Sequence, residues 1–251
     1  MFEDSLRMLS YSIIYFLVAA LVSIFLVKIF RVKQSQDIGV YKVIFTSINC
    51  GFMGFPITKM IFGDEGLYFM VLHNIILNFY LYSLCTIQLN SGAQKGEILK
   101  ALKSIINPCI ISAVIGIVML FAGVHLPEYL DNVLTPLGDS SIPMAMTLVG
   151  MQLAEGNIIK CFTNKKLILF SVVTMFVWPI VVLTVVKFIP MYSMVKTILV
   201  LGSALPPATT ISALAANEGA NYKLAADGII ITTLFTILSV PMITMLMSVF
   251  L

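Results

Sequence analysis

The chain has 251 residues, of which 59% are hydrophobic and 11% charged, and its formal net charge is +3. Soluble domains carry about 25% charged residues. A mean hydropathy of +1.02 therefore excludes a soluble fold and predicts an all-α polytopic membrane protein embedded in a lipid bilayer. The four cysteines are isolated from one another and from paired histidines, so neither a metal site nor a disulfide framework is expected. No cofactor and no nucleic-acid partner are expected either.

Eight hydrophobic spans of roughly 18 to 25 residues follow one another, each long enough to cross a bilayer. They lie at 8–30, 40–62, 67–89, 105–124, 133–153, 166–189, 194–215 and 224–250. The first span is too long for a secretory signal and lacks a small-residue cleavage site, so we expect it to stay in the mature protein. The turns between spans are short, so no extramembrane domain is expected.

Lysine and arginine residues are shared unequally between the two sides of this arrangement. Four of the 15 fall on one side, namely Arg7, Lys59, Lys187 and Lys196. The other eleven fall on the opposite side, namely Lys28, Arg31, Lys33, Lys42, Lys95, Lys100, Lys103, Lys160, Lys165, Lys166 and Lys223. Because cytoplasmic loops are enriched in positive residues, both termini are predicted outside a bacterial-type plasma membrane.

Two of the spans are interrupted by glycine and proline. The first break reads NCGFMGFP at 49–56, and the second reads ALPPATT at 204–210. An unpaired backbone group in hydrocarbon is so unfavourable that a helix breaks only where the freed groups are buried in protein or face a cavity. Two breaks therefore predict one shared site near mid-membrane, an arrangement found in secondary transporters. Ordinary proline kinks are the simpler alternative, since both residues are common in membrane helices.

The positions of the breaks indicate an inverted repeat. The second span runs outward and the seventh runs inward, so the broken helices cross in opposite senses at an offset of five spans. The fourth and fifth spans then have no mates, and two helices of a ten-helix 5+5 fold are expected to be missing before Met1. We expect a remainder of the first repeat at 1–89, a cytoplasmic linker at 90–104 and a second repeat at 105–251.

The residues at the breaks resemble a known family. The stretch SINCGFMGFPI at 47–57, followed by FGDEG at 62–66, is similar to the first crossover of the auxin efflux carrier family, which includes bacterial permeases for malate and malonate. The segment at 201–217 and the Thr-Thr-Leu run at 232–234 resemble its second crossover and last helix. The resemblance implies a ten-helix carrier of a small organic anion, with a transport part that crosses at the two breaks.

The candidate substrate-binding residues all lie at a break: Asn49, Gly51, Gly54, Pro56, Pro206, Pro207, Thr209 and Thr210. Uncapped N–H groups of half-helices and their positive dipole ends suit a carboxylate, which favours an organic anion. The glycines let the backbone approach a ligand, the amide and hydroxyls offer hydrogen bonds, and the prolines stop the helix at fixed places.

Three ionisable residues are candidates for a coupling ion or a cavity contact. Asp139 and Asp227 lie near predicted span ends, where an exposed helix cap is the alternative. His73 forms a polar patch with Asn74 and Asn78 at helical spacing, and the alternative is a structural histidine that bonds across helices.

Other functional classes find less support. An intramembrane aspartyl protease needs Gly-x-Gly-Asp and Tyr-Asp motifs, a serine protease needs a nucleophile with a histidine partner, and neither set is present, so an enzyme is disfavoured. No phosphate-binding loop for ATP occurs. A non-transporting remnant or a partner subunit is a further alternative, because two helices of the repeat are expected to be missing. A second copy could rebuild the site, so a homodimer is also an alternative.

Overall fold

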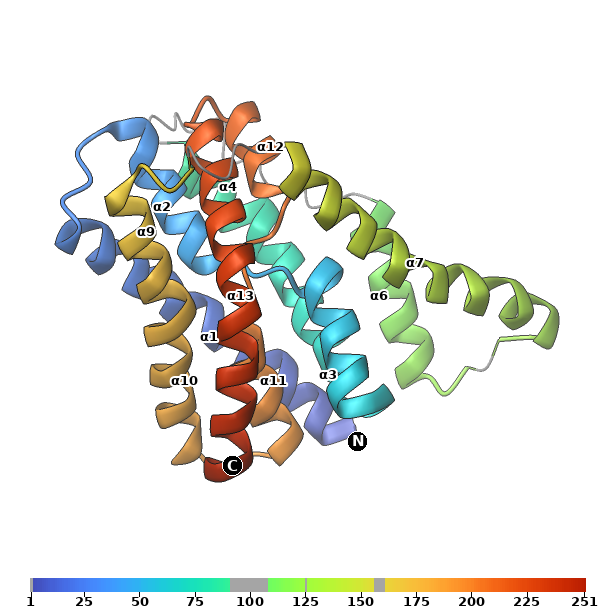
Figure 1. Ribbon diagram of the computed structural model, residues 1–251. Helices are drawn as coiled ribbons and strands as arrows, with labels where there is room; N and C mark the ends of the chain where they lie inside the picture. The colour runs from blue at the N-terminus through green and yellow to red at the C-terminus, as the bar shows by residue number, and fades with distance from the viewer. Residues whose placement is uncertain (1, 91–107, 125, 156–160) are drawn as a thin grey trace.

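A computed structural model describes residues 2–90, 108–124, 126–155 and 161–251, and within these residues every regular element is a helix (Figure 1). The α-helices are α1 (Phe2–Ile29), α2 (Ser35–Thr46), α3 (Phe55–Tyr80), α4 (Thr86–Leu89), α6 (Pro108–Phe121), α7 (Glu128–Glu155), α9 (Lys165–Val172), α10 (Trp178–Lys187), α11 (Ser193–Ser203), α12 (Ile211–Asn217) and α13 (Tyr222–Phe250). Three π-helical turns are η1 (Cys50–Gly54), η2 (Leu81–Cys85) and η3 (Val173–Val177). Except for Asn90, the predicted linker at 90–104 lies outside the described residues.

Long apolar helices confirm the expected all-α membrane fold. Within the described residues, four helical segments are long and apolar enough to cross a bilayer, namely Glu3–Ile29, Ser35–Leu89, Lys165–Lys187 and Tyr222–Phe250. The Ser35–Leu89 segment has 55 residues. A bilayer crossing needs only about 20, so this segment must make two crossings.

The Ser35–Leu89 segment folds back on itself at Gly63. Its backbone there has φ 66° and ψ −157°, a combination that is essentially restricted to glycine. The chain then returns to its start, and Gly39 of α2 packs directly on the backbone of Gln88 and Leu89 in α4. A Cβ at position 39 would lie 2.8 Å from the Leu89 Cα. The separate spans predicted at 40–62 and 67–89 are therefore two arms of one helical hairpin.

Both predicted breaks exist, although the first is shorter than expected. Residues 47–49 alone are non-helical there, because the chain enters η1 at Cys50. Pro56 lies within the first turn of α3, where its missing N–H has no intrahelical role. The expectation that Pro56 stops a helix is therefore wrong. At the second break α11 ends at Ser203 and α12 begins at Ile211, which matches the prediction of 204–210.

The two broken helices run in opposite directions. The start of α2 lies beside the start of α13, since the Asn221 N–H donates to the Gln36 carbonyl at 3.3 Å. The start of α11 lies at the other end of the bundle, beside the Gly63 turn. There the Tyr192 hydroxyl donates to the Glu65 carboxylate at 2.6 Å, and this bond raises the pKa of Tyr192.

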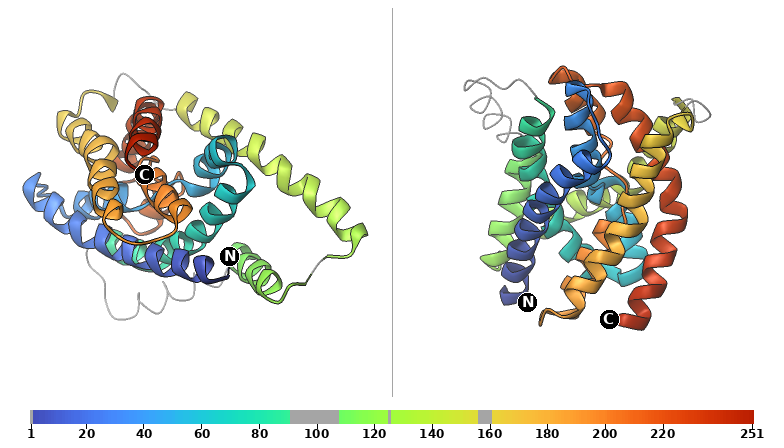
Figure 2. Two further views of the ribbon diagram at one scale, coloured as in Figure 1. Left: turned by 90° about the horizontal axis from the view of Figure 1, so that it is seen from below. Right: turned by 90° about the vertical axis from the view of Figure 1, so that its left-hand side faces the viewer.

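Helices α6 and α7 lie to one side of the remaining helices (Figures 1 and 2). They meet the rest of the bundle along the first broken helix, with α6 against α3 and α7 against η1. Both ends of the chain lie at the same end of the bundle (Figure 1). The first broken helix is therefore placed between the two groups of helices.

Candidate functional site

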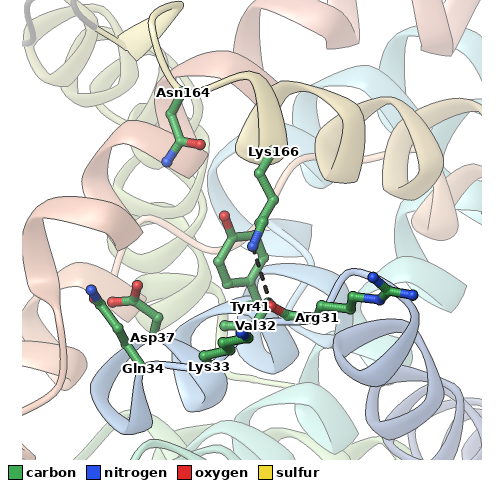
Figure 3. A pocket seen from close by; sticks show the side chains of 8 residues that line it. All are labelled: Arg31, Val32, Lys33, Gln34, Asp37, Tyr41, Asn164 and Lys166. Atoms are coloured by element: carbon green, nitrogen blue, oxygen red, sulfur yellow. Dashed lines mark hydrogen bonds between the residues drawn. The ribbon is translucent and has the colours of Figure 1, made fainter.

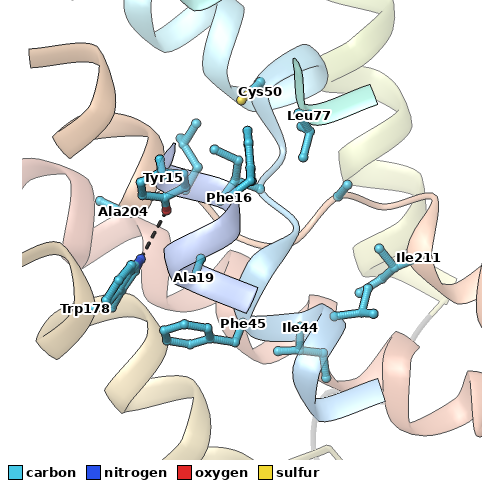
Figure 4. Close-up of a cluster of buried hydrophobic side chains, with 14 of the residues drawn as sticks. Tyr15, Phe16, Ala19, Ile44, Phe45, Cys50, Leu77, Trp178, Ala204 and Ile211 are labelled. Atoms are coloured by element: carbon cyan, nitrogen blue, oxygen red, sulfur yellow. Dashed lines mark hydrogen bonds between the residues drawn. The ribbon is translucent and has the colours of Figure 1, made fainter. Parts of the chain in front are cut away.

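The two breaks meet inside the protein. The Asn49 N–H of the first break donates to the Pro206 carbonyl of the second at 2.7 Å. Beside this bond the Leu205 side chain packs against the backbone of Gly54. The labelled core residues of Figure 4 surround this region, with Cys50 of the first break and Ala204 of the second among them. The helix interruptions expected from the sequence thus form one crossing point.

Helix α13 supplies a further partner for the unwound backbone. The Ser239 hydroxyl donates to the Ala204 carbonyl at 3.1 Å, and both residues are buried. A carbonyl at the end of a helix has no intrahelical donor, and leaving it unpaired in a buried place costs about 1–3 kcal/mol. Ser239 therefore stabilises the open end of α11.

Asn49 caps the helix that follows the first break. Its Oδ1 accepts a hydrogen bond from the Phe52 N–H at 3.1 Å. The expectation of uncapped N–H groups is therefore wrong for Phe52. The Asn49 side-chain nitrogen, in contrast, has no hydrogen-bond partner among the residues that the structure describes, and the residue is only 4% exposed. A buried amide without an acceptor is uncommon, so this group can donate to an acceptor that enters the site.

The two glycines of the first break have different surroundings. A Cβ on Gly54 would lie 3.0 Å from the Leu205 Cδ1 and 3.3 Å from the Met70 Sδ. A Cβ on Gly51 would have no atom within 4 Å. Gly54 is therefore needed for close packing of the two breaks, whereas the space beside Gly51 is open.

The second break presents its polar residues unequally. Thr209 is buried, and Thr210 is exposed at the start of α12, where its side chain makes no capping bond. Pro206 is the acceptor of the Asn49 bond, and Pro207 follows it in the same unwound stretch. In the second break, Pro206 and Thr209 are therefore buried in the protein, whereas Thr210 lies at an exposed position.

His73 lies beside the crossing, fully buried in α3. Its Nδ1 is 2.8 Å from the Ser12 Oγ of α1, and its ring stacks on Phe16 with 5.0 Å between centroids. Its Nε2 has no hydrogen-bond partner within the described part of the chain and faces Gly202 of α11, where a Cβ would lie 3.3 Å away. His73 is therefore packed against α11 just before the second break. The three residues of the expected polar patch have different partners. His73 contacts Ser12 of α1, whereas the Asn78 amide donates to the Asn74 carbonyl of its own helix.

The two candidate aspartates lie at different places. Asp139 of α7 forms an ion pair with Lys59 of α3, with 3.5 Å between Nζ and Oδ1. Lys59 follows η1 by about one helical turn, so this pair joins α7 to the first broken helix. Asp227 accepts a hydrogen bond from the Cys161 thiol at 3.2 Å. It precedes Ser239 by twelve residues of α13, which is about 18 Å along a helix. The structure therefore brings Asp139, and not Asp227, close to the crossing.

Some of the residues that build the site have no distinctive sequence signal. Ser239, Ser12 and Gly202 are small residues inside apolar helices, where such residues usually mediate helix packing. Lys59 was assigned only to a side of the membrane. Its ion pair depends on a partner 80 positions away.

Comparisons with known proteins identify the family of the chain. The family described as membrane transport protein matches residues 1–244 of the chain. An uncharacterized transporter of Methanocaldococcus jannaschii is 26% identical over 220 residues, which cover 85% of this chain and 70% of the relative. The family expected from the two crossover motifs is thereby confirmed.

Proposed function

Because the chain belongs to the membrane transport protein family, we propose that it carries a small organic anion across a plasma membrane by alternating access. The chain is a membrane-embedded transporter. The proposal adds the substrate, a carboxylate such as malate, malonate or an auxin-like acid, and the site, which is the crossing of the two breaks. It also places both termini outside.

The observation that carries the proposal is the buried contact between the breaks. The bond from the Asn49 N–H to the Pro206 carbonyl spans two helices that run in opposite directions. At that point the Asn49 amide nitrogen is buried, and no described residue offers it an acceptor. A carboxylate oxygen is the acceptor that such a donor favours, because hydrogen bonds to charged groups contribute about 1.5–3 kcal/mol.

Movement is compatible with this construction. Few backbone hydrogen bonds hold the unwound stretches, and the crossing lies where α7 packs against η1. A shift of the crossing helices against α6 and α7 would expose the site first to one side and then to the other. This is the rigid-body scheme by which repeat-based carriers alternate access.

The test is uptake of labelled malate and malonate by proteoliposomes that contain the purified chain. Asn49→Asp keeps an oxygen that can cap Phe52 but replaces the donor by a negative charge. We expect this variant to insert but to melt below the wild type, because a buried carboxylate without a partner is unfavourable. Per folded molecule it should lose uptake at least tenfold, because about 1.4 kcal/mol of lost binding corresponds to a factor of ten. Pro207→Ala is expected to abolish uptake without affecting insertion.

Thr184→Ala is the matched control for these variants. Thr184 is exposed on α10, and its hydroxyl donates to the Ile180 carbonyl of the same helix at 2.8 Å. Full uptake by Asn49→Asp would overturn the assignment of the site. Absence of uptake of every dicarboxylate by the correctly inserted wild type would overturn the choice of substrate.

A further inference from the structure

A polar pocket of about 470 Å³ lies at the end of the bundle, away from the crossing (Figure 3). The turn between α1 and α2 forms one wall, and the start of α9 forms the other. The residues that line it are Arg31, Val32, Lys33, Gln34, Asp37, Tyr41, Asn164 and Lys166. Figure 3 shows the Lys166 side chain reaching across from α9 to the turn, where its ammonium donates to the Arg31 carbonyl at 3.3 Å.

The net charge of this pocket is positive. Arg31, Lys33 and Lys166 carry three cations, of which the Arg31 guanidinium extends away from the other lining residues in Figure 3. None of the three forms a salt bridge with any residue that the structure describes. Asp37 is the single acidic residue of the lining. Its carboxylate already accepts a hydrogen bond from the Asn221 amide at 2.8 Å. An anion that enters the pocket therefore meets free donors.

The surroundings of the pocket indicate where that anion comes from. Ile29, two residues before Arg31, is 71% exposed, and Leu169, one turn after Lys166 on the same face of α9, is 58% exposed. Both are exposed apolar residues near the ends of helices that are long and apolar enough to cross a bilayer, a position that suits contact with acyl chains. Cations placed just beyond such residues lie at the depth of the lipid phosphates.

We propose that this pocket binds the phosphate of an anionic phospholipid headgroup, with Arg31, Lys33 and Lys166 as its ligands. Basic pockets between membrane helices are a known means of recognising anionic headgroups. The pocket lies between the turn after α1 and the start of α9. These two segments are also in contact through the Phe30 and Phe170 rings, whose centroids are 5.2 Å apart. A bound headgroup would strengthen this junction by bridging both walls.

The backbone at Arg31 offers a variant that removes a cation and preserves the turn. Arg31 has φ 48°, and its N–H and that of Val32 bond to the Lys28 and Val27 carbonyls at 3.0 and 3.2 Å. This pattern ends a helix with a left-handed residue, a position at which glycine is preferred. Arg31→Gly therefore retains the local fold. Lys166→Gln is the second variant, because glutamine keeps a donor for the Arg31 carbonyl.

The experiment measures thermal unfolding of the full chain in nanodiscs of phosphatidylcholine with an increasing share of phosphatidylglycerol. We expect the wild-type melting temperature to rise with phosphatidylglycerol and each variant to need about fivefold more of it, since one cation near a membrane surface contributes about 1 kcal/mol. The rise should shrink at high salt, because the groups are partly exposed. Equal melting temperatures in pure phosphatidylcholine will show that the variants are folded.

Lys223→Gln is the matched control, because it removes one cation at the same end of the bundle but outside the pocket lining. It should respond like the wild type. An identical response in all four proteins would show general surface electrostatics and overturn the proposal, as would no response in the wild type. A rise produced by inorganic phosphate in pure phosphatidylcholine that removes the lipid effect would assign the pocket to a soluble phosphate and overturn the lipid assignment.

Discussion

Adding one methyl group at Gly54 tests whether the two breaks are packed as closely as the structure has them. In Gly54→Ala the new carbon would lie 3.0 Å from the Leu205 Cδ1 and 3.3 Å from the Met70 Sδ. Overpacking of this kind usually costs about 1–3 kcal/mol. Gly51→Ala adds the same methyl group three residues earlier, where no atom lies within 4 Å.

The comparison of these variants isolates the packing contribution. Both changes gain the same helical preference of alanine over glycine, roughly 0.5–1 kcal/mol. The difference in unfolding free energy between the two variants should therefore equal the overpacking cost. At about 2–4 °C per kcal/mol for a chain of this size, Gly54→Ala should melt several degrees below Gly51→Ala.

Thermal unfolding in nanodiscs is the assay, and Leu205→Val in the Gly54→Ala background is the internal check. Shortening the Leu205 side chain should recover part of the loss, because the two positions are in contact and therefore coupled. Equal melting temperatures for the two alanine variants, with no recovery by Leu205→Val, would refute the close contact between the breaks. Uptake by the stable Gly51→Ala variant then reports whether substrate uses the open space beside that residue.

Two further changes test how the broken helices are supported. Ser239→Ala leaves the buried Ala204 carbonyl without its donor and should lower the unfolding free energy by about 1–3 kcal/mol, measured by thermal melting; an unchanged melting temperature would show that the carbonyl has another partner. Gly63→Ala places a side chain at φ 66° and ψ −157°, which should destabilise the Ser35–Leu89 hairpin by roughly 1–3 kcal/mol. Lower yield of folded protein after solubilisation measures this loss, and a yield equal to that of the wild type would contradict the turn geometry.

Much of the fold was predictable because membrane insertion depends on local composition. Runs of apolar residues predict the crossings. The double proline at 206–207 predicts the second break, which lies between the end of α11 at Ser203 and the start of α12 at Ile211. The first break was harder to place. Its glycines and Pro56 are compatible with π-helical and α-helical backbone, so the helix resumes at Cys50, before the residues that were expected to interrupt it.

The candidate site was predicted in part. Sequence reasoning selected Asn49 as polar, but it could not tell that the amide oxygen is used to cap Phe52 while the amide nitrogen is buried without an acceptor among the described residues. Nor could it show that the Asn49 backbone N–H bonds to the second break, 157 positions away. Asp139 and Asp227 looked alike in sequence, and only the ion pair with Lys59 distinguishes them.

By itself the sequence determined the membrane class, the family and the places where two helices cannot continue, because each of these depends on residues adjacent in the chain. The tertiary structure decided which groups meet across the breaks, that Ser239 closes the end of α11, and that Arg31 and Lys166 line one pocket. Those contacts join segments separated by 35 to 157 positions. Such pairings arise from packing of whole helices against one another, and no local pattern of residue types specifies them.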